Sequence, residues 1–176
     1  MEFKKVVVLV LISAQQILDA VPTDKISEEH SRIETTFLAV DCEKRVVGEI
    51  PFYVDTYRDV LAINAGNPAY RDAYAQAALT WTGATGTYDL RLETLGEVDG
   101  NSDYRVWVGN QMVGVALNIP TEIDYAPQYF IFRDVELSKG CTITVEAAAR
   151  SNDKVPEGDG YAYARGRWKS LMVLKN

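Results

Sequence analysis

The middle of the chain alternates regularly between apolar and polar residues. Every second residue is apolar in the stretch 88–93, and the stretch 104–108 resumes the same period after an acidic break that contains glycine. Successive side chains of a strand point to opposite faces, so this pattern predicts two half-buried antiparallel strands joined by a turn. Gly109-Asn110 follows directly and is typical of a second tight turn.

Further segments carry strand signals and are separated by loops rich in glycine, proline and polar residues. Residues 46–54 contain Pro51, which predicts an edge strand or two short pieces, and the alanines of residues 74–81 also suit a helix. The alternation changes phase at Arg133-Asp134, which predicts a bulge or a bend. These short strands predict an all-β fold of two packed antiparallel sheets. The other expected strands are 36–43, 60–63, 112–117, 130–137, 141–147 and 168–174.

The beginning of the chain has the pattern of a secretion signal. Lys4 and Lys5 precede an apolar run over residues 6–12, and small residues follow at Ser13 and Ala14. The run is too short to span a bilayer, and the alternative is a buried strand. We therefore expect a secreted or periplasmic protein with a signal peptide over residues 1–20, a polar leader or linker over 21–34 and one folded domain over 35–176.

The charge of the chain narrows the range of partners. The 176 residues carry a formal net charge of −7, whereas nucleic acids and anionic membranes attract clustered lysine and arginine. We therefore expect neither as a partner, while neutral sugars and cations remain compatible. Arg165 and Arg167 with Lys169 form one local basic patch, whose alternative interpretation is a solvated strand end.

The two cysteines, Cys42 and Cys141, both fall in expected strands. In an exported protein such a pair can form a disulfide. The alternative is two buried free thiols.

The residues that most enzymes need are scarce. The only histidine, His30, lies in the expected leader, so neither a Ser-His-Asp nor a Cys-His arrangement can be built inside the domain. A zinc motif and a phosphate-binding glycine loop are also absent from the sequence. Carboxylates are plentiful, but the sequence singles out no pair of the kind that a glycosidase places across a scissile bond.

Acidic clusters raise the question of calcium, which prefers carboxylate and carbonyl oxygens. Asp41 and Glu43 are two residues apart, so we expect both on one side of a strand. Residues 97–103 match the first half of an EF-hand loop but lack its glycine and terminal glutamate, so a hairpin turn is the favoured interpretation. A third cluster lies at Asp153, Glu157 and Asp159, and solvated loops are the alternative for all three.

Aromatic residues are the candidates for a sugar platform, because the C–H face of a sugar stacks on an indole or phenol ring. Trp107 is out of phase with its apolar neighbours, so we expect it to face solvent or a cleft. Trp81, Tyr125, Tyr161 and Trp168 lie at strand ends or beside loops, where packing in the core is the alternative role.

Three segments resemble carbohydrate-binding modules of families 6 and 35. Val40-Asp41-Cys42-Glu43 is similar to their acidic opening strand, residues 86–92 resemble a G-x-Y-x-l-x-l strand, and residues 104–110 resemble a later hairpin. The resemblance covers roughly residues 36–175. It implies a jelly-roll β-sandwich, a glycan cleft formed by loops at one end or on a concave face, and a structural calcium between the first and last strands. Asp41 and Glu43 would bind that calcium, and Asp159 would replace an acidic residue that the last strand lacks, unless the metal site is lost.

The resemblance also suggests roles for residues 151–171. Asn152 would form hydrogen bonds with sugar hydroxyls, and Tyr161 or Trp168 would be the platform. Arg165 and Arg167 would meet carboxylate or sulfate groups of an acidic glycan.

The function that we expect is that of a secreted, non-catalytic carbohydrate-binding module that holds a polysaccharide or oligosaccharide by stacking and hydrogen bonding. Such modules are commonly attached to larger glycan-degrading enzymes. One alternative is a small jelly-roll glycoside hydrolase, or a polysaccharide lyase that uses tyrosine and arginine. A second alternative is a structural or adhesion domain without a glycan site.

Overall fold

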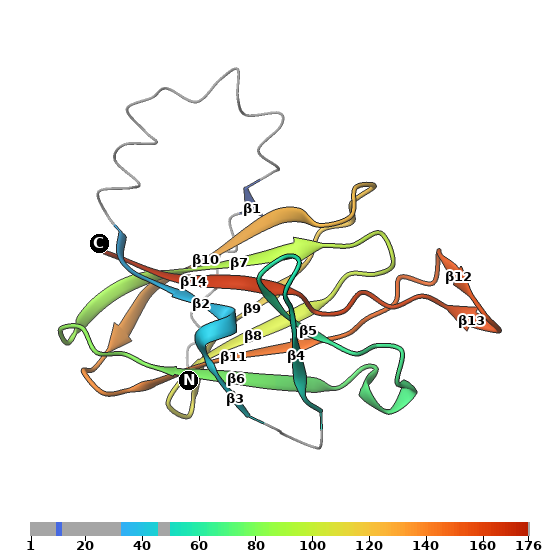
Figure 1. The fold of residues 1–176 in the computed structure, drawn as a ribbon. Coiled ribbons are helices and arrows are strands. Elements are labelled where there is room, and N and C mark those ends of the chain that lie inside the picture. Colours follow the sequence, from blue (N-terminus) through green and yellow to red (C-terminus); the bar gives the residue numbers. More distant parts are fainter. Residues whose placement is uncertain (1–9, 12–32, 46–49, 176) are drawn as a thin grey trace, which may run out of the picture.

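Antiparallel strands make up nearly all of the regular secondary structure. A computed structural model describes residues 10–11, 33–45 and 50–175, and two short 3-10 turns, η1 (Ala39–Asp41) and η2 (Pro68–Tyr70), interrupt the strands (Figure 1). The strands are β1 (Val10–Leu11), β2 (Ile33–Leu38), β3 (Glu43–Arg45), β4 (Phe52–Asp55), β5 (Val60–Ile63), β6 (Tyr74–Thr80), β7 (Gly86–Gly96), β8 (Asp103–Val108), β9 (Gln111–Leu117), β10 (Ala126–Leu137), β11 (Thr142–Ala148), β12 (Pro156–Glu157), β13 (Gly160–Tyr161) and β14 (Trp168–Lys175).

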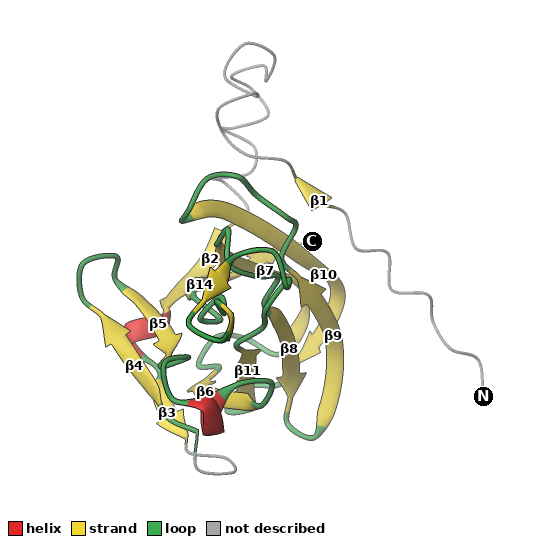
Figure 2. Ribbon diagram, turned by 90° about the vertical axis from the view of Figure 1, so that its right-hand side faces the viewer, coloured by secondary structure: helices red, strands yellow, loops and turns green. Residues whose placement is uncertain are grey.

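Two sheets pack face to face and form a β-sandwich, seen end-on in Figure 2. The larger sheet has the order β1-β10-β7-β14-β5-β4, with β2 also paired to β14, and the smaller sheet has the order β3-β6-β11-β8-β9. The strands of each sheet pair antiparallel. The prediction of an all-β, two-sheet antiparallel jelly-roll sandwich is confirmed.

The core lies between the two inner faces and uses the apolar positions that alternate in the sequence. Leu90 and Leu92 of β7 and Val106 of β8 are fully buried. Burying one such side chain contributes roughly 1.5–3 kcal/mol of transfer free energy. Trp81 and Trp168 are also 0% exposed, so both rings are part of this core.

The prediction that the strands around residues 88–93 and 104–108 pair with each other as a hairpin is wrong. Strand β7 pairs with β10 and β14 in the larger sheet, whereas β8 pairs with β11 and β9 in the smaller one. Residues 97–102 therefore cross from one sheet to the other. Alternation identifies the buried face of each strand but contains no information about which sheet the strand joins. The tight turn at Gly109-Asn110 does join β8 to β9, with Gly109 in the left-handed region at φ 56°.

The expected strand 36–43 is divided in the structure. β2 pairs with β14 in the larger sheet, η1 follows, and β3 pairs with β6 in the smaller sheet. Asp41 and Glu43 therefore do not lie on one face of one strand. The structure decides two open alternatives: residues 74–80 form a strand and not a helix, and β4 after Pro51 is an edge strand. The predicted bulge is confirmed, because the register between β10 and β7 shifts between Phe132 and Val135.

The signal peptide expected over residues 1–20 and the leader over 21–34 lie outside the described residues, apart from Val10–Leu11 and the first residues of β2. β1 pairs with Phe130 and Tyr129 of β10. The described part of the chain contains no helix of the length and apolar character that crossing a membrane requires.

Cys42 and Cys141 are not joined by a disulfide. Cys42 directly precedes β3 and Cys141 directly precedes β11, and these strands lie on opposite sides of β6. Two strand spacings place the cysteines roughly 10 Å apart. A disulfide needs Cα atoms within about 7 Å, so the structure does not favour a disulfide between Cys42 and Cys141.

Candidate functional site at the loop end of the sandwich

Four connections meet at one end of the sandwich, which faces the viewer in Figure 2. They are residues 56–59 between β4 and β5, residues 97–102 between β7 and β8, residues 118–125 between β9 and β10, and residues 162–167 before β14. Side chains at the ends of the strands bind these loops to one another. We call this region the loop end.

A buried polar network holds the loops of the loop end in place. The Asn118 side chain is 2% exposed, donates to the Leu95 carbonyl oxygen at 3.0 Å and accepts from the Thr94 hydroxyl at 2.6 Å. The Tyr104 hydroxyl donates to the Arg167 carbonyl oxygen at 2.9 Å. Burial raises the pKa of the Tyr104 phenol far above its usual value, so this donor keeps its proton.

Arg167 lies beneath this end and is only 3% exposed. Its guanidinium forms ion pairs with Glu97, which is also buried, and with Asp55 at 3.3 Å. These pairs join the ends of three strands, β14, β7 and β4. The prediction that Arg167 meets a glycan is therefore wrong, because Arg167 is buried. The chain turns at Gly166, where φ is 58°, so Arg165, Arg167 and Lys169 do not form a row of exposed cations.

Tyr125 presents an aromatic ring at the surface, with its backbone in the left-handed region at φ 66° and 36% of the residue exposed. The Arg58 guanidinium lies 3.6 Å from the ring centroid and is paired with Asp55 at 3.1 Å. The Arg167 guanidinium lies 5.1 Å from the same centroid. Burial raises the pKa of Asp55, but hydrogen bonds from Arg58 and Arg167 outweigh it and hold the pKa below its usual value.

Arg165 completes this surface. Its backbone N–H donates to Glu97 Oε2 at 2.6 Å, and its exposed guanidinium donates to the Tyr53 hydroxyl at 3.3 Å. The hydrogen bond to Tyr53 is the largest influence that raises the pKa of Arg165. Next to Arg58, Tyr57 is 88% exposed. We define the tyrosine–arginine surface by its five residues, Tyr53, Tyr57, Arg58, Tyr125 and Arg165.

Sequence reasoning named only two of these residues, Arg165 as a ligand and Tyr125 as a ring beside a loop. Tyr53, Tyr57 and Arg58 were missed because they lie on the hairpin of β4 and β5, far from Arg165 along the chain. Only the polar and aromatic composition of residues 53–58 was available as a signal.

Other predicted binding residues have different positions. Trp168 is 0% exposed, so its predicted role as a sugar platform is wrong. The Asn152 amide donates to the Val98 carbonyl oxygen at 2.9 Å and accepts from the Lys154 N–H at 3.0 Å, so it ties its own loop to the β7–β8 connection. Tyr161 is 45% exposed on the small β12–β13 hairpin, which projects from the domain (Figure 1).

Trp107 lies on the outer face of the smaller sheet, where its β8 position pairs with Thr144 and Met112. The residue is half-buried, as its alternation predicts. Trp107 is four residues from Asp103 at the loop end, or roughly 13 Å along the strand. It therefore belongs to a different surface from Arg165.

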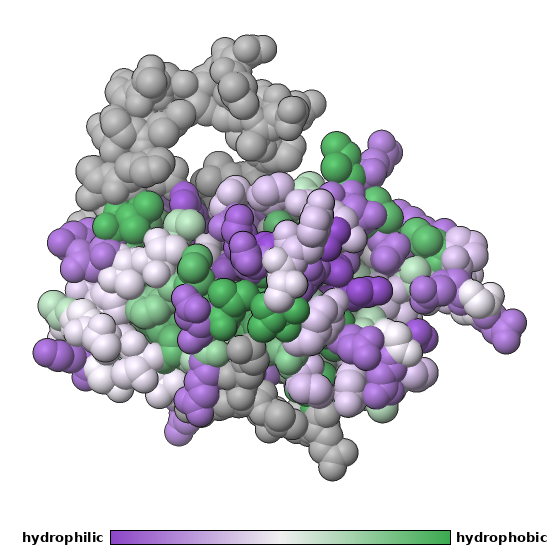
Figure 3. Space-filling view, in the orientation of Figure 1, coloured by the Kyte–Doolittle hydropathy of each residue, from purple (hydrophilic) through white to green (hydrophobic). Residues whose placement is uncertain are grey.

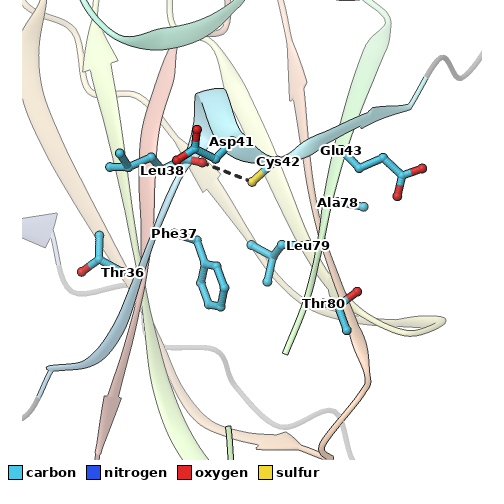
Figure 4. A pocket seen from close by; sticks show the side chains of 9 residues that line it. All are labelled: Thr36, Phe37, Leu38, Asp41, Cys42, Glu43, Ala78, Leu79 and Thr80. Carbon is cyan, nitrogen blue, oxygen red and sulfur yellow. Dashed lines mark hydrogen bonds between the residues drawn. The ribbon is translucent and has the colours of Figure 1, made fainter. Parts of the chain in front are cut away.

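The predicted calcium ligands do not converge. Asp41 and Glu43 line a pocket of about 470 Å³ beside η1, and Figure 4 shows the Glu43 side chain pointing away from Asp41. Asp159 lies in the projecting β12–β13 hairpin, well apart from them. No group of three or more acidic, histidine or cysteine side chains suited to a metal occurs among the described residues. The arrangement of Asp41, Glu43 and Asp159 does not fit a calcium ion.

Apolar side chains line much of the same pocket. Phe37 and Leu79 extend into it in Figure 4, and the Cys42 thiol donates to the Leu38 carbonyl oxygen at 3.4 Å. Apolar residues also gather in the middle of the face shown in Figure 3, around the positions of η1 and β4.

Comparison with known proteins identifies the type of fold. A family 35 carbohydrate-binding module from Clostridium thermocellum matches 80% of this chain and 98% of its own, with a TM-score of 0.50 and 12% identity. An exo-β-1,3-galactanase from Phanerochaete chrysosporium matches 79% of this chain and 29% of its own, with a TM-score of 0.50 and 9% identity. The chain thus has the fold of a carbohydrate-binding module, as its resemblance to family 35 implied.

Sequence comparison adds one relative. The uncharacterized protein P23 of Formosa agariphila is 32% identical over 91 residues, which are 50% of this chain and 20% of that protein. The chain therefore spans about a fifth of the curated relative that it matches. No family model matches the chain.

Proposed function

We propose that this protein is a non-catalytic carbohydrate-binding module that holds a glycan on the tyrosine–arginine surface. The observation that carries the proposal is the exposed Tyr57 ring beside Tyr125, whose ring is held against Arg58 at 3.6 Å. The fold that the chain shares with the family 35 module supports the proposal.

The chemistry of the surface suits a sugar. Exposed phenol rings offer apolar faces for the C–H groups of a pyranose, and their hydroxyl groups accept and donate hydrogen bonds. The Arg58 and Arg165 guanidinium groups are already oriented by Asp55 and Tyr53, so little conformational entropy is lost when they donate to sugar hydroxyls. We expect modest affinity, because these hydrogen bonds replace hydrogen bonds to water.

Replacing Tyr57 or Tyr125 by alanine is expected to weaken glycan binding by about 5- to 10-fold, the loss of one stacking contact. The measurement is calorimetric titration with an oligosaccharide selected on a glycan array. Trp107→Ala is the control, since it removes a half-buried ring from the outer face of the smaller sheet, a different surface. If the control loses binding and Tyr57→Ala and Tyr125→Ala do not, the glycan lies elsewhere.

The proposal that the chain is not an enzyme has its own test. Candidate polysaccharides are incubated with the purified protein and assayed for new reducing ends and unsaturated products. We expect none to form, whereas sustained product release would establish the alternative of a hydrolase or lyase.

We further propose that the protein is exported and acts beside glycan-degrading enzymes. The support for export is the sequence pattern of residues 4–14. Expression with the native N-terminus should yield an extracytoplasmic protein shortened by 14 or 20 residues, and an intact cytoplasmic protein would contradict export.

A further inference from the structure

The charges around the tyrosine–arginine surface are unequal. Three arginines lie at the loop end, but Arg167 is paired with Glu97 and Asp55, and Arg58 is paired with Asp55. Arg165 donates its side-chain hydrogen bond to the phenol of Tyr53. Arg58 and Arg167 are therefore paired with carboxylates within the protein, whereas the hydrogen-bond partner of the Arg165 side chain is uncharged.

Additional carboxylates come from three different segments, and one of them, Asp99, is close enough to Arg165 to influence it. Asp99 belongs to the β7–β8 connection, Asp124 to the β9–β10 connection, and Glu157 to the β12–β13 hairpin. Burial, and then the negative charges of Asp124 and Glu157, raise the pKa of Asp99, while Arg165 opposes them. The Asp124 carboxylate accepts a hydrogen bond from the Val98 N–H at 2.9 Å, which places it beside Asp99.

The four connections of the loop end, with the adjoining Asp55 and Glu157, therefore carry seven carboxylates against three arginines. The carboxylates are Asp55, Asp59, Glu97, Asp99, Glu122, Asp124 and Glu157. The net charge of these residues is therefore negative at neutral pH, in agreement with the formal charge of −7 for the whole chain. A glycan with carboxylate or sulfate groups would be repelled here, whereas an uncharged glycan would meet no such repulsion.

We infer that the tyrosine–arginine surface selects uncharged glycans and rejects chains bearing carboxylate or sulfate. This inference rests on the proposed function and replaces the expectation of an acidic glycan. That expectation depended on a basic patch that the structure disperses: Arg167 is buried, and Lys169 lies 3.9 Å from Glu93 on the larger sheet. Discrimination comes from repulsion between like charges, which is one way in which a site excludes the wrong ligand.

The test uses pairs of oligosaccharides with the same backbone, one uncharged and one sulfated, titrated at low ionic strength. For the unmodified protein we expect the uncharged member to bind at least about 10-fold more tightly. Added salt should narrow the difference because it screens the repulsion. Equal or tighter binding of the sulfated member would overturn the inference while leaving glycan binding intact, whereas absence of binding to every oligosaccharide would refute the proposed function itself.

The double variant Asp99→Asn/Asp124→Asn provides the second arm. It should bind the sulfated member about 3- to 10-fold more tightly than the unmodified protein does, with unchanged affinity for the uncharged member. Glu136→Gln is the control for loss of a negative charge elsewhere, because it removes one exposed carboxylate from β10. It should change neither affinity. Unchanged discrimination in the double variant would show that Asp99 and Asp124 do not exclude the charged chain.

The pH dependence of affinity for the sulfated oligosaccharide is an independent test, since a sulfate group remains charged at low pH. The pKa of Asp99 is raised by burial and by Asp124 and Glu157, so Asp99 is protonated at a higher pH than an ordinary aspartate. Affinity for the sulfated member should therefore begin to rise as the pH falls through that raised pKa. Asp99→Asn should lack this component, and an identical pH response in the variant would contradict the role of Asp99.

Discussion

Replacing Arg167 by alanine is expected to lower the free energy of unfolding by about 3–5 kcal/mol, the cost of breaking a buried ion pair. The substitution leaves the Glu97 carboxylate buried without its cation and removes one of the two arginines that bind Asp55. It also removes the guanidinium beneath Tyr125. Urea denaturation followed by circular dichroism measures the change.

Arg165→Ala is the matched control, because Arg165 is two residues away, is exposed and has no such buried partner pair. We expect it to change the unfolding free energy by less than about 1 kcal/mol. If Arg167→Ala were as stable as Arg165→Ala, Arg167 would belong to the solvent-exposed patch that the sequence suggested.

The same ion pairs make stability depend on acidity. Arg58 and Arg167 lower the pKa of Asp55 in the folded protein, so Asp55 adds stability above its unfolded pKa of about 3.9. That contribution is lost as the pH falls from this value through the lower folded pKa. Asp55→Asn should flatten the decline of the melting temperature below about pH 4, and an unchanged acid profile would contradict this role.

Trp168→Ala is expected to destabilise the fold by about 3–5 kcal/mol, the range for removing a large ring from a packed core. Trp168 is 0% exposed and lies where β14 pairs with Leu61 of β5 and Thr94 of β7. The melting temperature and the urea midpoint should both fall.

Trp168→Phe separates packing from binding. The indole Nε1 has no hydrogen-bond partner within the described part of the chain, so phenylalanine removes volume but no hydrogen bond. This variant should remain folded, lose less stability than Trp168→Ala and bind glycan normally. A folded Trp168→Phe protein with strongly reduced binding would return the ring to the binding site.

Much of the sandwich could be predicted because strand formation is largely a local property. Alternation marked β7, β8 and β11, Gly109-Asn110 marked a turn, and the phase change at Arg133-Asp134 marked a bulge. The pairing of β7 with β10 and β14 could not be predicted in this way, since those partners are distant in sequence. β7 and β8 are adjacent in the sequence but lie in different sheets, because residues 97–102 cross from one sheet to the other.

The candidate site was predicted less completely than the fold. Its expected residues came from one continuous segment, 151–171, in which the order of aromatic and basic residues was visible but their depth was not. Trp168 and Arg167 are buried, while Arg165 is exposed just before the turn at Gly166. The rings that join Arg165 come from β4, from the turn after it and from the loop before β10.

The order of amino acids alone determined which segments become strands, where the chain turns, and that a histidine-free domain of negative charge offers many phenol rings. Tertiary packing decided which of those rings are exposed to solvent. It also decided that Arg167 is buried and forms ion pairs with carboxylates at the ends of other strands. Burial and charge pairing depend on neighbours brought together across two sheets, so no reading along one segment contains them.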